Sequence, residues 1–239
     1  MPHLIWDGAD AAKHKIVCAD HWYDGIPLVR KKYNTWLAWD GEKAQVGNKN
    51  ATAAREKGIR DIQYKAAHHL GGRPVVVGET GIPLDMEDGK AFKTGDFRMQ
   101  ELAMNGVLSA LEVCFASSTL WNYTPDNNNA RGDNWNGEDL SIFSRDQMVG
   151  NKTIDDGGRA IKAAVRPHVR AYVGTPTVQR FNMDTKEFVF QFVTALQSAG
   201  TPQSGSGSPG SGDGGSPRPK TPGGAGHRAG AGSHRRPDA

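Results

Sequence analysis

The stretch Pro74-Val-Val-Val-Gly-Glu79-Thr-Gly-Ile-Pro83 predicts the centre of the fold. Three consecutive valines are typical of a strand that is buried on both faces, as in a parallel sheet. We therefore predict a strand over residues 74–78, with Gly78 allowing the backbone to turn closely beside the acid that follows. Glu79 lies at the predicted end of this strand, immediately before a loop rich in glycine and proline. Catalytic groups of α/β proteins are placed at such strand ends; the alternative is a partly exposed loop glutamate.

The rest of the chain alternates between strand and helix patterns. Apolar runs predict strands over 15–20 and 117–122, and helical spacing of apolar residues predicts helices over 51–69, from a cap at Thr94 or Asp96 to about 115, and over 156–165. This order indicates α/β units with a parallel sheet. Three units are too few for a closed eight-stranded barrel, and a small open sheet fits by count. The character of the sequence changes over residues 171–195, and its last part, 187–193, alternates as a β-strand does, which predicts the start of an all-β module.

The C-terminal residues have a different composition. Residues 201–239 contain 11 glycines, 6 prolines and 6 serines but no aromatic or large aliphatic residue, so we predict disorder over 197–239. This tail carries five basic and two acidic residues, which accounts for the whole net charge of +3. The remaining residues are balanced, at 24 basic and 24 acidic. A nucleic-acid-binding domain is expected to carry a basic stripe in its folded part, and we therefore expect no nucleic-acid partner.

Other features exclude further classes of protein. No run approaches the roughly 18 apolar residues of a membrane span, and the first residues lack a secretory signal, so a cytoplasmic location is the default expectation. Cys18 and Cys114 each lie in an apolar run, which favours two buried thiols over a disulfide. No motif for a metal ion or a phosphate-containing cofactor is present, and we expect neither a metal nor a cofactor.

Polar and aromatic residues follow each of the three predicted strands. Because the ends of parallel strands meet at one edge of a sheet, these side chains are expected to converge. Aromatic rings stack on the apolar faces of sugars, and carboxylates and amides bind sugar hydroxyls. A carboxylate held at such a site can act as the nucleophile of a glycosidase. The candidate residues are Glu79 as nucleophile, with His21, Tyr23, Trp121, Asn122, Glu138 and Asp139 around it.

Several ordered motifs resemble one known family. They are His21-Trp-Tyr-Asp-Gly25, Gly78-Glu-Thr-Gly-Ile-Pro83, Leu120-Trp-Asn-Tyr-Thr124 and Gly132-Asp-Asn-Trp-Asn-Gly-Glu-Asp-Leu-Ser-Ile-Phe143. Between Lys15 and Phe188 the chain is similar to glycoside hydrolase family 5, in its endoglycoceramidase and steryl-β-glucosidase-like branch. The resemblance implies a retaining hydrolase of β-glucosides, with a glycolipid such as a steryl glucoside or glucosylceramide as substrate.

The resemblance also implies a fold and residue roles. Residues 1–165 would be the last strands and helices of a (β/α)8 barrel, 166–196 the start of a β-sandwich domain, and 197–239 the disordered tail. Glu79 would be the nucleophile, Tyr23 and His21 its neighbours, and Trp121 the platform under the sugar. Asn122, Glu138 and Asp139 would bind substrate, and ordering of their own loop is the alternative for the last two.

One catalytic residue of that family has no counterpart in this sequence. Its general acid/base is a glutamate in an Asn-Glu-Pro-like motif, and no Asn-Glu dipeptide occurs here. The retaining mechanism needs two carboxyl groups about 5–5.5 Å apart. The chain is therefore expected to represent the C-terminal part of such an enzyme. The alternatives are a catalytically incompetent fragment that binds sugar or lipid weakly, and a small open-sheet binding protein. Exposed barrel edges would favour self-association.

Overall fold

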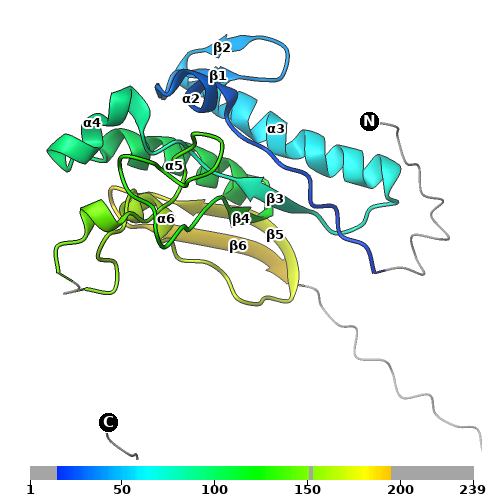
Figure 1. Ribbon diagram of the computed structural model, residues 1–239. Helices are drawn as coiled ribbons and strands as arrows, with labels where there is room; N and C mark the ends of the chain where they lie inside the picture. Colours follow the sequence, from blue (N-terminus) through cyan, green and yellow to red (C-terminus); the bar gives the residue numbers. More distant parts are fainter. Residues whose placement is uncertain (1–14, 151–152, 195–239) are drawn as a thin grey trace, which may run out of the picture. The chain divides into compact units, whose positions relative to one another are not determined.

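The computed structural model describes residues 15–150 and 153–194, so the predicted disorder of 197–239 concerns residues outside this description (Figure 1). The elements follow one another in the order α2 (Gly25–Arg30), β1 (Leu37–Trp39), β2 (Ala44–Val46), α3 (Asn48–His69), β3 (Val76–Thr80), α4 (Met86–Thr94), α5 (Arg98–Val113), β4 (Ser117–Leu120), the 3-10 turn η1 (Arg145–Gln147), α6 (Ile161–Ala164), β5 (Gly174–Phe181) and β6 (Phe188–Thr194).

A parallel β layer lies at the centre, as the alternation of elements predicts. β3 pairs with β4 in parallel. Residues 18–22 run along the other edge of β3, where the amides of Val76 and Gly78 donate to the carbonyls of Cys18 and Asp20 at 2.8 and 2.9 Å. The predicted strand over 15–20 is thus an extended segment with isolated parallel bridges at Cys18 and His21. The fold class α/β is confirmed.

Gly78 serves this close pairing. A Cβ atom on Gly78 would lie 2.5 Å from the carbonyl oxygen of Ala19, which no side chain can occupy without moving the backbone. The sequence predicted a turn at Gly78, and this prediction is wrong. The strand continues to Thr80, so Glu79 lies within β3. Glycine is therefore required because the neighbouring segment approaches closely.

The two long helices build the core against this layer (Figure 1). Helix α3 includes the predicted helix 51–69, and α5 matches the second prediction, with Asp96 accepting the amide of Arg98 at 3.0 Å near its start. The core contains residues from α3, β3 and α5 that are almost wholly excluded from solvent, among them Ile59, Val77, Met104 and Val107.

The third predicted helix is mostly wrong. Of residues 156–165, only Ile161–Ala164 are helical. Gly157 has a φ of 83° and packs directly on the ring of Phe143, and Phe143 forms an antiparallel bridge with Gly158. Tertiary contacts with the loop before it therefore override the helical pattern. Three short elements, α2, the β1–β2 hairpin and α4, were not predicted.

The predicted β segment at 171–195 forms one antiparallel hairpin, β5 and β6, whose strands pair only with each other within the described residues. Arg166 anchors the hairpin to α5, because its guanidinium binds Glu112 at 2.7 Å and lies over the ring of Phe181. Both cysteines are free thiols, with Cys114 buried and Cys18 partly exposed. In the part of the chain that the structure describes, no helix is long and apolar enough to cross a membrane.

Candidate active site

Glu79 is bound by a tyrosine from the neighbouring segment. The hydroxyl of Tyr23 donates to Oε1 of Glu79 at 2.5 Å. His21 Nδ1 lies 3.6 Å from the second carboxylate oxygen, Oε2. The side chain of Glu79 is 25% exposed and that of His21 57% exposed, so the site opens to solvent. Three of the predicted site residues are therefore brought together at the end of the parallel strands.

The sequence His21-Trp-Tyr-Asp24 produces this arrangement by alternation. In an extended segment successive side chains point to opposite sides. His21 and Tyr23 face Glu79, whereas the indole of Trp22 lies against Gly58 on α3. A Cβ atom on Gly58 would lie 2.0 Å from Nε1 of Trp22, so this mid-helix glycine makes room for the indole.

Asp24 fixes the other end of this segment through a buried ion pair. Arg55 of α3 donates from Nε to Oδ2 of Asp24 at 2.7 Å, and both side chains are almost fully buried. The same guanidinium donates to the carbonyls of Asn34 and Leu37. Asp24 also accepts the amide of Ile26 at the start of α2. Sequence reasoning missed Arg55, since nothing in its local pattern distinguishes it from other helical arginines.

The environment of Tyr23 keeps its hydroxyl protonated. Burial raises the pKa of Tyr23 well above its usual range, and the hydrogen bond to the Glu79 carboxylate and the charges of Glu79 and Glu138 raise it further. Ionising this phenol would place a third negative charge beside two carboxylates. Tyr23 therefore acts as a hydrogen-bond donor to Glu79.

Trp121 follows β4 and lies beside the end of β3. Its amide donates to the carbonyl of Thr80 at 2.8 Å, and its peptide bond to Asn122 is cis. A Cβ atom on Gly81 would lie 2.1 Å from the Trp121 carbonyl oxygen and 3.8 Å from Cε1 of Tyr23. Gly81 thus permits the close approach that brings Trp121, Tyr23 and Glu79 to one end of the sheet.

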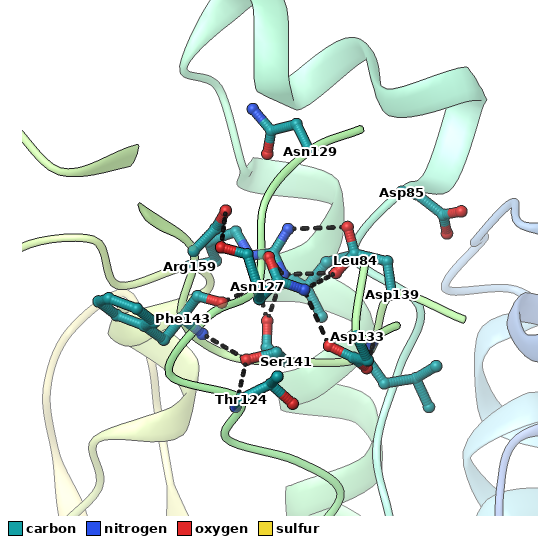
Figure 2. A network of polar contacts seen from close by, with 12 residues as sticks. Leu84, Asp85, Thr124, Asn127, Asn129, Asp133, Asp139, Ser141, Phe143 and Arg159 are labelled. Atoms are coloured by element: carbon teal, nitrogen blue, oxygen red, sulfur yellow. Dashed lines mark hydrogen bonds and ion pairs between the residues drawn. The ribbon is translucent and has the colours of Figure 1, made fainter. Parts of the chain in front are cut away.

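Asp139 belongs to a buried polar network in the loop after β4 (Figure 2), and Asn122 joins this network through Asp133. Asn122 donates to Oδ2 of Asp133 at 3.1 Å and accepts from the hydroxyl of Thr124. Asp133 also accepts the amide of Leu140 at 2.8 Å and the side-chain amide of Asn127 at 2.8 Å. These bonds hold both ends of the loop together.

Arg159 is the centre of that network. It is fully buried, and its guanidinium binds both carboxylate oxygens of Asp139 at 2.5 and 3.0 Å (Figure 2). It also donates to the carbonyl of Ser141 and to Oδ1 of Asn127. Asp139 therefore directs its carboxylate into the protein, which favours the loop-ordering interpretation. Sequence reasoning placed Arg159 in a helix and missed its role.

Glu138 differs from its neighbour. It is half-buried, and within the described residues its carboxylate forms no hydrogen bond or ion pair, although its charge contributes to the raised pKa of Tyr23. Adjacent residues thus place one carboxylate near Tyr23 and the other on Arg159. Among residues 15–150 and 153–194, no group of three His, Cys, Asp or Glu side chains could hold a metal ion.

Comparisons with known proteins point to glycolipid glucosidases. The chain is 32% identical over 203 residues to a glucosylceramidase of Rhizopus delemar, covering 75% of this chain and 30% of the relative. It is 36% identical over 146 residues to the ergosteryl-β-glucosidase of Saccharomyces cerevisiae, covering 56% of this chain and 19% of that protein. No protein-family model matches the chain.

Part of a solved structure has the same fold as most of this chain. The chain superposes on sterylglucosidase 1 of Cryptococcus neoformans with a TM-score of 0.67 and 31% identity, covering 73% of this chain and 28% of that one. The relatives are glycosidases by name, so the chain is similar in sequence and fold to enzymes of the steryl-glucosidase type. It spans less than a third of the length of these relatives, 30% of the Rhizopus protein and 28% of the Cryptococcus one.

Proposed function

We propose that this chain supplies the nucleophile and glycone platform of a retaining β-glucosidase acting on a glycolipid, either a steryl glucoside or glucosylceramide. The observation that carries the proposal is the hydrogen bond from Tyr23 to Glu79, made where two parallel strands end on the same side. The names of the relatives support the substrate class. In this assignment the chain belongs to the branch of glycoside hydrolase family 5 that it resembles.

The first step of such a reaction forms a covalent intermediate. A carboxylate oxygen of Glu79 attacks the anomeric carbon, the bond to the aglycone oxygen breaks, and that oxygen takes a proton from a general acid. Water then attacks the anomeric carbon and gives a proton to the same residue, which now acts as general base, while the bond to Glu79 breaks and frees its carboxylate. Tyr23 holds Oε1, so Oε2 becomes the attacking atom, with His21 beside it. Trp121 would stack under the sugar ring.

The remaining residues have separate proposed roles. Glu138 carries a carboxylate with no partner among the described residues and is proposed to accept a sugar hydroxyl. Asn122 and Asp139 support the loop that presents it, because their side chains bind Asp133 and Arg159. Any contact of Asn122 or Asp139 with substrate is therefore indirect in this proposal.

The proposed architecture is the last part of a (β/α)8 barrel. The segment 18–22, β3 and β4 would be its final strands, residues 1–165 the barrel part and 166–196 the start of a β-sandwich domain. The general acid/base would come from elsewhere, since the sequence contains no Asn-Glu dipeptide. This observation favours a second candidate: a chain that binds sugar or lipid weakly and does not turn over substrate.

The test is covalent labelling of Glu79. The chain is incubated with a 2-deoxy-2-fluoro β-glucoside whose leaving group needs little acid assistance, and intact mass is recorded. An adduct mapped to Glu79, absent in Glu79→Gln, supports the nucleophile assignment. A chain that shows cooperative thermal unfolding but gains no mass supports the second candidate. Labelling of another carboxylate would contradict the assignment.

A further inference from the structure

The hairpin of β1 and β2 turns an apolar face to solvent. Leu37 pairs with Val46 and Trp39 pairs with Ala44, so these four side chains project from one side of the hairpin. Ala38 projects from the opposite side and is fully buried against α3. A hairpin with one buried face normally carries polar residues on the other. Here Trp39 is 45% and Val46 61% exposed.

The neighbouring helix also carries an exposed apolar side chain. α2 packs beside β1, and a Cβ atom on Gly25 would lie 3.9 Å from the Cβ of Trp39 (Figure 1). Near the end of α2, Val29 is 77% exposed. We define the hairpin surface as the apolar residues Val29, Leu37, Trp39, Ala44 and Val46 together with the basic residues of segment 25–50, which are Arg30, Lys31, Lys32, Lys43 and Lys49.

That segment is basic in an otherwise balanced chain. Residues 25–50 contain five Lys or Arg and two Asp or Glu, although residues 1–200 carry 24 of each sign. The basic residues are Arg30, Lys31, Lys32, Lys43 and Lys49, and all five are exposed. Lys31 is paired with Asp85, and the other four basic residues form no ion pair within the described part of the chain. The segment thus combines exposed tryptophan and aliphatic side chains with more basic than acidic residues.

The turn that presents this surface is ordered by Asp40. Its Oδ1 accepts the amides of Glu42 and Lys43, each at 2.9 Å, and its Oδ2 accepts the side chain of Gln45. These bonds lower the pKa of Asp40 to about 2, and the bond from the Lys43 amide contributes most. Asp40 therefore orders the turn and keeps its negative charge at neutral pH.

The hairpin surface is attached to the candidate active site. α2 begins two residues after Tyr23 and is capped by Asp24. Lys31 forms an ion pair with Asp85, and its carbonyl accepts the amide of Glu87 at 3.0 Å, both in the connection that follows β3. The hairpin surface and Glu79 therefore belong to connections at the same end of the parallel strands.

We propose that the hairpin surface docks on an anionic lipid bilayer. Indole rings favour the boundary between headgroups and acyl chains, and lysine and arginine are attracted to anionic headgroups. The choice of a bilayer over a protein partner rests on the proposed function, because steryl glucosides and glucosylceramides reside in membranes. Docking through this surface would place the Glu79 site next to its substrate.

The test is flotation of the full 239-residue chain with phosphatidylcholine vesicles, with and without phosphatidylserine. We expect co-flotation that depends on phosphatidylserine. The double variants Trp39→Ser/Val46→Ser and Lys32→Glu/Lys43→Glu should each weaken partitioning by about tenfold or more, since a basic residue near an anionic surface contributes about a fivefold factor. The tail's basic residues are common to all variants, so only differences between variants count.

Two single variants on α3 provide controls, one for loss of an exposed aromatic ring and one for reversal of an exposed charge. Tyr64→Ser removes an aromatic side chain that is 71% exposed, and Lys65→Glu reverses an exposed charge. Both positions lie about 24 Å along the helix from Asn48, and both variants should bind as the wild type does. Equal weakening by the controls, or undiminished binding of both hairpin variants, would overturn the proposal. So would a hairpin-dependent self-association in a chain that binds no vesicles.

Further controls separate folding and catalysis from docking. The lysine variant changes only exposed side chains, so it tests docking even if the Trp39→Ser/Val46→Ser chain loses its thermal transition. Glu79→Gln should float like the wild type. Vesicle binding without labelling of Glu79 would reject the proposed function alone, and labelling without vesicle binding would reject the docking surface alone.

Discussion

Two neighbouring carboxylate sites in this molecule are built in opposite ways. Asp139 is buried, and Arg159 and Asn127 satisfy its oxygens. Glu79 is 25% exposed, with one oxygen bound by Tyr23 and the other only near His21. A fully satisfied buried network holds a structure in place. A carboxylate with one free oxygen at a strand end is available for chemistry, and the comparison explains why the two acids should respond differently to substitution.

The largest expected effect is on the Arg159 network. Arg159→Met leaves Asp139 buried without its cation, and we expect a loss of about 3–5 kcal/mol in the free energy of unfolding. Urea unfolding followed by circular dichroism measures it. Lys57→Met, which breaks the exposed pair with Asp61, is the control and should leave the urea midpoint almost unchanged. An Arg159→Met chain as stable as the control would show that the network is not needed for folding.

The next effect concerns the close pairing beside Glu79. Gly78→Ala forces a Cβ atom toward the Ala19 carbonyl, and we expect a loss of about 1–3 kcal/mol of stability together with weaker labelling of Glu79. Gly25→Ala is the control, since its Cβ would meet Trp39 only at an ordinary 3.9 Å. Wild-type stability in Gly78→Ala would mean that segment 18–22 does not approach β3 as described.

Tyr23→Phe should separate function from stability at the Glu79 site. It removes one hydrogen bond to a carboxylate that still reaches solvent, so stability should fall by about 1 kcal/mol or less. The rate of covalent labelling should fall by about 10- to 100-fold, because the carboxylate loses the contact that orients it. Labelling at the wild-type rate would remove Tyr23 from the proposed mechanism.

The smallest effect appears only at high pH. The folded-state pKa of Tyr23 is raised, so the unfolded chain releases this proton first, above the ordinary tyrosine pKa of about 10. Below that pH both states are protonated and the stabilising effect of the protonated phenol is fully present. Above it, the free energy of unfolding should decrease more steeply with pH in the wild type than in Tyr23→Phe. Superimposable pH profiles would contradict the raised pKa.

The sequence predicted the parts of the fold that depend on local pattern. The valine run before Glu79 and the helical spacing of 51–69 and of the segment after Asp96 were confirmed as β3, α3 and α5. The helix over 156–165 was mostly wrong because Gly157 and Arg159 are held by residues of the preceding loop. No local pattern reveals that constraint, since the contacts join residues 14 to 20 positions apart.

The candidate site shows the same division. Residue types at strand ends, with the motifs that contain them, identified Glu79, His21, Tyr23 and Trp121 as one group, and the structure brings them to one end of the sheet. The sequence did not separate Glu138 from Asp139. Adjacent residues in a turn have similar local chemistry. Only the position of Arg159 shows which of the two carboxylates forms a buried ion pair.

By itself, the sequence determined the strand or helix type of the main buried segments, β3, α3 and α5, and which acid follows the valine run. Hydrophobic periodicity and glycine placement are local properties and can be read without a structure. Only the tertiary structure decided which polar side chains have buried hydrogen-bond or ion-pair partners and which side chains remain exposed to solvent. Arg55 holds Asp24 behind Tyr23, and the β1–β2 hairpin turns Trp39 and Val46 outward. Both facts depend on contacts between distant residues, which local pattern does not specify.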